Sequence, residues 1–202
     1  MISTIFSGKI RDRIDAWVFT LFTVLGVYQG EVTIFYILYF FWWNEAAIIS
    51  VDRLFYKRNP QAIFTSEEST TTPISRSLFV LGIYFVFIVV FFGFIANWQN
   101  QKLLITNLEV LFFHNWFFNL NLSFVLLERL YRHWTNKPVL MSSGIFTVNM
   151  IVLHISIILS AFILFFVVFR YPDIFTPDNL WGSVLIITPF LLLRLVLTRI
   201  KI

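Results

Sequence analysis

The chain has 202 residues, of which 58% are apolar and 20% aromatic, and it carries a formal net charge of +4. Together with a mean hydropathy of +0.81, this composition excludes an ordinary soluble domain. The apolar residues stand in long blocks and do not alternate with polar ones, which favours membrane-spanning helices over barrel strands. Because the sequence has no cysteine, disulfides, thiolate metal sites and a cysteine nucleophile are excluded.

The apolar blocks predict an all-α, polytopic integral membrane protein that forms one transmembrane domain over residues 1–202. The six expected helices cover residues 14–28, 32–56, 77–96, 103–131, 146–169 and 180–197. Pro189 is expected to kink the last of them. The polar stretch 59–76 is the only sizeable loop that this interpretation leaves.

The distribution of positive charge predicts the orientation of the bundle. Of the 15 lysines and arginines, only Lys102 and Arg170 fall in the first, third and fifth connections, and the others gather at the termini and in the second and fourth. The positive-inside rule then places both termini and the 59–76 loop in the cytoplasm, for a protein of the inner (plasma) membrane. Since the basic residues adjoin membrane segments, their expected partner is the lipid bilayer and its anionic inner leaflet, and no nucleic acid is expected.

Two polar residues interrupt the middle of the 32–56 segment. Asn44 and Glu45 stand there between long apolar runs. If this helix is centred in the bilayer, the pair lies near mid-depth, where an acidic side chain costs about 2.5–3.5 kcal/mol on insertion scales. Glu45 is therefore expected to face other helices or a wet cavity.

Further polar residues share helix faces with a spacing of seven residues. Glu45 and Asp52 have this spacing on the second expected helix, and the fourth repeats it from His114 to Glu128. A mid-membrane carboxylate with imidazoles and amides nearby is the material of a proton relay or a cation site. The hypothetical ion or solute site comprises Asn44, Glu45, His114, Asn121, Glu128 and His154.

Structural roles compete with this site. Asn119, Asn121 and Asn149 are also expected as hydrogen-bonding links between helices. Local ion pairs at the interface, Asp52 with Arg53 and Glu128 with Arg129, would account for the charges at the helix ends.

No enzyme or cofactor motif is present in the sequence. Neither His-x-x-x-His nor Glu-x-x-His spacing occurs, so no metal is expected. A phosphate-binding glycine loop and a Gly-x-Ser-x-Gly motif are also missing, so no cofactor and no catalytic residue are assigned, and a non-enzymatic role is favoured over an enzymatic one.

A short internal similarity links the ends of the second and fourth expected helices. At an offset of 76 residues, VDRLFYKRNP aligns with LERLYRHWTNKP, so that Asp52 falls on Glu128 and Glu45 on Asn121. Both segments are followed by an apolar, phenylalanine-rich helix. The alignment predicts a parallel repeat, whereas the common transporter architecture uses inverted ones.

The stretch FYILYFFWWNEAAIISVDRLF resembles the uncharacterised bacterial membrane family DUF6498, which shows an aromatic-Trp-x-Glu motif at this place. Here Trp42, Trp43, Asn44 and Glu45 match it, with Trp42 in place of the usual tyrosine. The likeness covers about 25 of the 202 residues and brings no known activity with it. It implies that Trp43 and Glu45 matter beyond packing.

Three functional hypotheses follow from the sequence. The first is a transporter- or channel-like protein, assembled as a homo-oligomer, that holds a proton, a cation or a small polar solute at Glu45. The second is a membrane scaffold or sensor with a soluble partner at the loop 59–76. The third is an intramembrane lipid-modifying enzyme, which requires a histidine within hydrogen-bond reach of Glu45.

Overall fold

The computed structural model describes residues 17–64, 73–141, 147–172, 174–175 and 179–200, and within these it is all-α apart from two three-residue strands. The helices are Trp17–Tyr28, α2 (Ile34–Phe55), α3 (Pro73–Phe87), α4 (Gln101–Leu111), α5 (Trp116–Trp134), α6 (Val148–Ile163) and α7 (Leu180–Ile200).

Four helical stretches are long and apolar enough to cross a membrane, and two more are apolar but shorter. The four are Ile34–Phe55, Ser77–Asn97, Gln101–Trp134 and Val148–Val168, and the shorter two are Trp17–Tyr28 and Leu180–Val196. They correspond to the six predicted segments, and they indicate an integral membrane location. Residues 14–16 and 146, which the prediction included, lie outside the described residues.

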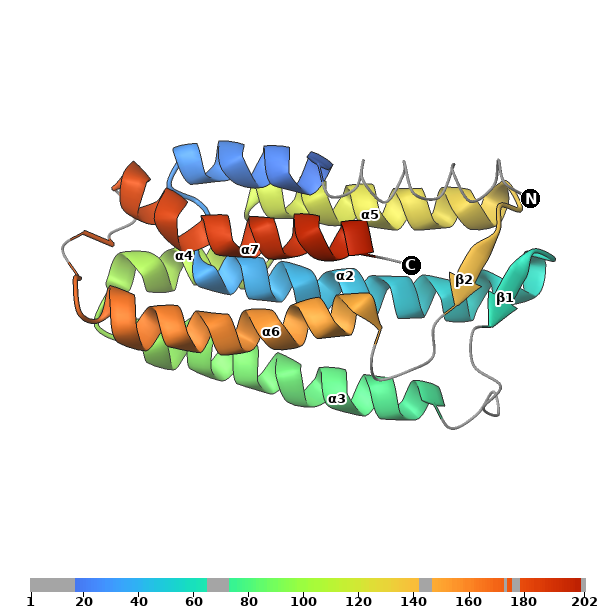
Figure 1. Cartoon of the computed structure of the whole chain (residues 1–202), viewed down its shortest axis with the longest axis horizontal. Helices are drawn as coiled ribbons and strands as arrows, with labels where there is room; N and C mark the ends of the chain where they lie inside the picture. The colour runs from blue at the N-terminus through green and yellow to red at the C-terminus, as the bar shows by residue number, and fades with distance from the viewer. Residues whose placement is uncertain (1–16, 65–72, 142–146, 173, 176–178, 201–202) are drawn as a thin grey trace.

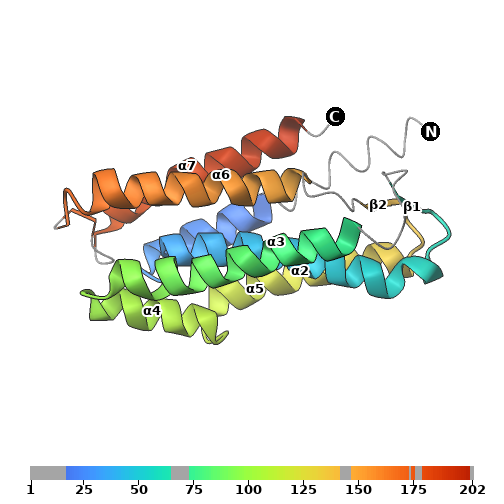
Figure 2. The same ribbon diagram turned by 90° about the horizontal axis from the view of Figure 1, so that it is seen from below.

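The helix α2 is the central element of the bundle, as Figures 1 and 2 show. It packs against α3, α4, α5, α6 and α7. All seven residues from Phe35 to Phe41 are buried, so this part of the helix has no outward face. The segment that stands out in the sequence for its central Asn44 and Glu45 is therefore the helix at the centre of the bundle.

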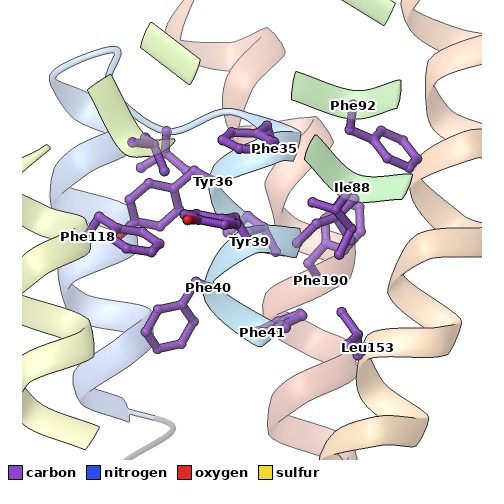
Figure 3. Close-up of a cluster of buried hydrophobic side chains, with 14 of the residues drawn as sticks. Phe35, Tyr36, Tyr39, Phe40, Phe41, Ile88, Phe92, Phe118, Leu153 and Phe190 are labelled. Carbon is purple, nitrogen blue, oxygen red and sulfur yellow. The ribbon is translucent and has the colours of Figure 1, made fainter. Parts of the chain in front are cut away.

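Aromatic rings fill the space around α2 (Figure 3). Tyr39 stacks on Phe35 at 5.1 Å and on Phe118 of α5 at 5.4 Å between ring centroids. Phe19 of the first helix stacks on Phe40 at 4.5 Å. Such packing contacts hold helices together in a membrane, because an apolar side chain gains little free energy by moving from lipid tails into the protein interior.

The predicted single helix over residues 103–131 is wrong, because the chain breaks it into α4 and α5. At the break, Phe113 has a φ of 60°, a left-handed conformation that a continuous helix does not contain. Asn115 then caps α5, since its Oδ1 accepts a hydrogen bond from the Phe118 N–H at 2.9 Å.

Both α3 and α6 continue into a π-helix. The two stretches are η2 (Ile88–Phe94) and η4 (Leu164–Val168), and their first residues are 76 positions apart, the offset of the sequence repeat. After η2 the chain makes a short 3₁₀ turn, η3 (Ile95–Asn97). The side-chain amide of Asn97, in this turn, donates a hydrogen bond of 2.8 Å to the Phe92 carbonyl of η2.

The ends of α2 and α5 lead into two short strands that pair in parallel. After a 3₁₀ turn, η1 (Tyr56–Arg58), strand β1 (Ala62–Phe64) pairs with β2 (Val139–Met141). The polar loop predicted over 59–76 is therefore partly wrong, because it contains β1 and the start of α3, and its residues 65–72 lie outside the description. The same order of helix, turn, strand and helix in both places agrees with a parallel repeat.

The glycines Gly82 and Gly93 occupy different environments. A Cβ built on Gly93 lies 3.2 Å from the ring of Phe35, whereas one on Gly82 meets nothing within 4 Å. We expect Gly93→Ala to destabilise the protein by about 1 kcal/mol or more, because Phe35 is buried and cannot move away. Gly82→Ala is the matched control, and equal unfolding temperatures of the two variants in detergent would contradict this packing.

Candidate functional site: buried polar groups along α2

Glu45 is buried inside the bundle, as expected, with 2% of its surface exposed. Its Oε1 accepts a hydrogen bond of 2.8 Å from the Thr147 hydroxyl, and Thr147 is the N-cap of α6. The N-terminus of a helix carries partial positive charge, which stabilises a nearby carboxylate. One α2 turn earlier, the Trp42 indole donates to the Leu81 carbonyl of α3 at 2.7 Å. The aromatic-Trp-x-Glu stretch therefore joins α2 to α3 and α6.

These contacts place Glu45 level with the start of α6, although it is near the middle of its own apolar span, Ile34–Phe55, so its depth in a bilayer stays a prediction. Val148–Val168 is 21 residues long, about 30 Å, which matches the hydrocarbon core of a bilayer. Glu45 is level with the first residue of this span. The reason is that α2 is not centred on its neighbours: α2 and α5 continue past the start of α6 toward β1 and β2 (Figures 1 and 2).

The strongest polar cluster lies two turns farther along α2. Asp52 accepts hydrogen bonds from the Arg129 guanidinium, with Nε at 2.6 Å from Oδ1 and Nη2 at 2.5 Å from Oδ2. The Nε2 atom of His133 lies 3.0 Å from Oδ1 of the same carboxylate. The side chains of Arg129, Asp52 and His133 are only 12%, 10% and 1% exposed, so this cluster is an internal link between α2 and α5.

The expected local ion pairs are wrong in their partners. Arg53 is exposed and does not pair with Asp52. Arg129 pairs with Asp52 of α2, and Glu128 pairs with Arg132. Sequence reasoning also missed His133, which lies beyond the end of the predicted helix over residues 103–131. A signal was present, since Arg129 and His133 are four residues apart and so project from the same face of α5 toward the acidic residue.

The stripe expected from His114 to Glu128 does not form. His114 is exposed in the break before α5, so it is not part of the helix that carries the other two. Asn121 is buried and donates to the Tyr36 hydroxyl at 2.9 Å, which confirms the alternative role of a link between helices. Glu128 forms its ion pair within α5.

The remaining predicted residues are also separate. His154 is exposed on α6 and bonds through Nδ1 to the Tyr84 hydroxyl of α3 at 2.6 Å. Asn119 donates to the Phe113 carbonyl in its own segment, so it is not the interhelical link that was expected. Asn44, which precedes Glu45 on α2, is buried, and Asn149 is half-buried in the first turn of α6. The structure thus distributes the six hypothetical site residues over several levels of the bundle.

Two polar contacts inside the bundle were not predicted. Asn107 of α4 accepts from the Thr33 hydroxyl at 2.8 Å and donates to the Gly93 carbonyl at 3.1 Å, which ties three helices together. The Arg194 guanidinium of α7 lies 4.2 Å from the Phe19 ring centroid and 5.1 Å from that of Phe40. Arg194 had been counted as a charge of the C-terminal end, yet it is buried.

A second acidic group lies in the turn between the first helix and α2. The Asn115 amide is 3.3 Å from both the backbone oxygen and Oε2 of Glu31. Partial burial raises the pKa of the Glu31 carboxyl, and the nearby charge of Glu109 raises it further. The folded protein therefore disfavours the ionised form of this side chain.

We expect Glu31→Gln to stabilise the protein at neutral pH. Because the pKa of Glu31 is higher in the folded than in the unfolded chain, its contribution to stability is full below about pH 4.5 and is lost as pH rises through the folded pKa. Glutamine keeps an oxygen for Asn115 and removes the charge. Melting temperatures measured in detergent at pH 4.5 and 7 should show a larger gain at pH 7, and an equal gain at both would contradict this assignment.

Comparison of the chain with family models, with curated proteins and with solved structures finds no match in any of the three. Among the described residues, no group of three or more histidine, aspartate or glutamate side chains is arranged to hold a metal ion. The resemblance to DUF6498 stays a prediction. The fold and the buried polar groups alone therefore carry the functional argument, and the length and composition of the helices indicate a multi-pass membrane protein.

Proposed function

We propose that the chain is a transporter- or channel-like membrane protein that binds a proton or a small cation at Glu45. The observation that carries this proposal is a 2% exposed carboxylate on the helix that all others surround. A buried acidic group in a membrane protein is costly to keep, and such groups mark ion pathways and proton relays. In this proposal both termini are cytoplasmic, and the end of the bundle at β1 and β2 faces the cytoplasm.

The position of Glu45 supports binding from one side. The residue is level with the first residue of α6, so an ion from the cytoplasm would cross little of the apolar span before reaching the carboxylate. Thr147 supplies a hydroxyl oxygen at the same place, and hydroxyl and carboxylate oxygens are suitable ligands for a hard cation.

The test is ion flux into proteoliposomes with Glu45→Gln. We expect the wild-type protein to dissipate an imposed proton gradient, read with an internal pH dye, or to admit Na⁺ or K⁺. Glutamine keeps an acceptor for Thr147 but cannot hold a proton or balance a cation, so flux should fall to that of empty vesicles. Glu109→Gln, an exposed residue of α4, is the matched control. Undiminished flux through the Glu45 variant would refute the role.

A membrane scaffold or sensor is the second candidate, and one observation favours it. Asp52, Asn121, Glu128, Arg129 and His154 each make a contact that joins or stiffens helices and needs no ligand. If the wild-type protein conducts none of the tested ions and Glu45→Gln alters only its melting temperature, this candidate replaces the first. The intramembrane enzyme receives no support, since the two sequence-predicted histidines, His114 and His154, lie elsewhere.

A further inference from the structure

Three basic residues form an exposed cluster at the end of α2. Arg53, Lys57 and Arg58 lie in the last turn of α2 and in η1, and all three side chains are exposed. In the described part of the chain, none of them forms an ion pair. Their charges are therefore available to a partner outside the chain.

The acidic residues described near this cluster are already neutralised. Asp52 is held by Arg129 and His133, and Glu128 is held by Arg132. The positive field of the three exposed residues is thus not cancelled by these neighbours. Glu67 and Glu68, which follow Arg58 in the sequence, lie outside the described residues.

The neighbouring end of α5 adds exposed aromatic rings. Asn59, just after η1, donates to the Lys137 carbonyl at 2.9 Å, which places the two helix ends side by side. There Trp134 is 71% and Tyr131 48% exposed, and the Lys137 ammonium lies 4.6 Å from the Tyr131 ring centroid. Basic residues together with tryptophan and tyrosine are typical of segments at a membrane surface.

The cluster lies beyond the level at which α6 begins. Arg53 is eight residues beyond Glu45, about 12 Å along α2 from that level, and Lys57 and Arg58 follow about one turn later. Long arginine and lysine side chains extend back toward the membrane, and the field of an anionic surface reaches about 8–10 Å into physiological salt.

We propose that Arg53, Lys57 and Arg58 bind the phosphate groups of anionic phospholipids. The inference concerns lipid recognition and does not depend on ion binding at Glu45.

Lipid selectivity of the protein in vesicles tests this inference. Spin-labelled phosphatidylglycerol and phosphatidylcholine report their relative association with the protein by electron paramagnetic resonance. We expect wild type to prefer phosphatidylglycerol, and R53Q/K57Q/R58Q to lose about fivefold of this preference for each charge that contacts lipid. The charge-keeping variant R53K/K57R/R58K should retain it, which shows that charge sets the preference, and an unchanged melting temperature of R53Q/K57Q/R58Q excludes a fault in folding.

Two further arms decide the source of the phosphate and the place of binding. K102Q/R170Q removes two charges at the opposite end of the bundle and should leave the preference unchanged. Sodium phosphate should displace the labelled lipid no better than sodium chloride of equal ionic strength. The proposal is overturned if R53Q/K57Q/R58Q keeps the full preference, if both sets of glutamine variants lose it equally, or if free phosphate competes specifically.

Discussion

Asp52→Asn should destabilise the protein by about 3–5 kcal/mol, the largest effect that we expect from a single polar substitution. The change leaves the Arg129 guanidinium buried against α2 without its carboxylate, and it also weakens the contact to His133. The cost comes mainly from a buried charge that loses the carboxylate of Asp52. Unfolding in mixed detergent micelles, followed by circular dichroism, would measure it.

Two variants make the test of Asp52 specific. Glu128→Gln breaks an ion pair between residues four apart on α5, and such a pair contributes about 0.5 kcal/mol. The double variant Asp52→Leu with Arg129→Met removes both charges at once and should recover most of the stability that Asp52→Asn loses. If the single and double variants are equally unstable, the loss of stability comes from altered side-chain packing and not from the broken ion pair.

The sequence predicted well what depends on local hydrophobicity. The six apolar segments and the burial of Glu45 follow from the length of the blocks and the cost of a charge in lipid. The break before α5 could not be predicted in this way, because the residues before it are apolar and the polar pair His114 and Asn115 is compatible with a continuous helix. Hydropathy does not report a positive φ.

The pairing of the polar groups could not be predicted from any single segment, because it depends on how distant segments pack against one another. Asp52 and Arg129 are 77 residues apart, and the sequence offered Arg53 and Glu128 as nearer partners. The depth of Glu45 depends on where α6 begins, and therefore on how far α2 extends past its neighbours. The repeat at an offset of 76 was the one long-range signal, and the two π-helices share it.

Phe118→Ala should cost about 3 kcal/mol, because this ring fills the contact between α5 and α2. It is fully buried, stacks on Tyr39, and meets the ring of Tyr36 edge-on at 5.5 Å between centroids. Removing a buried phenylalanine costs about 3–5 kcal/mol in soluble cores. The lower value is expected here, since an unfolded helix in lipid or detergent also keeps its side chains out of water and only the packing is lost.

Phe79→Ala supplies the matched control for the same chemical change. That ring lies on α3 with 70% of its surface exposed, so its removal leaves no cavity. We expect the Phe118 variant to melt well below wild type and the Phe79 variant to melt close to it. Because Asn121 is one turn away on α5 and bonds Tyr36, the cavity should also loosen that hydrogen bond. Equal melting temperatures for the two variants would mean that α5 is held to α2 by the polar contacts of Asn121 and Arg129 alone.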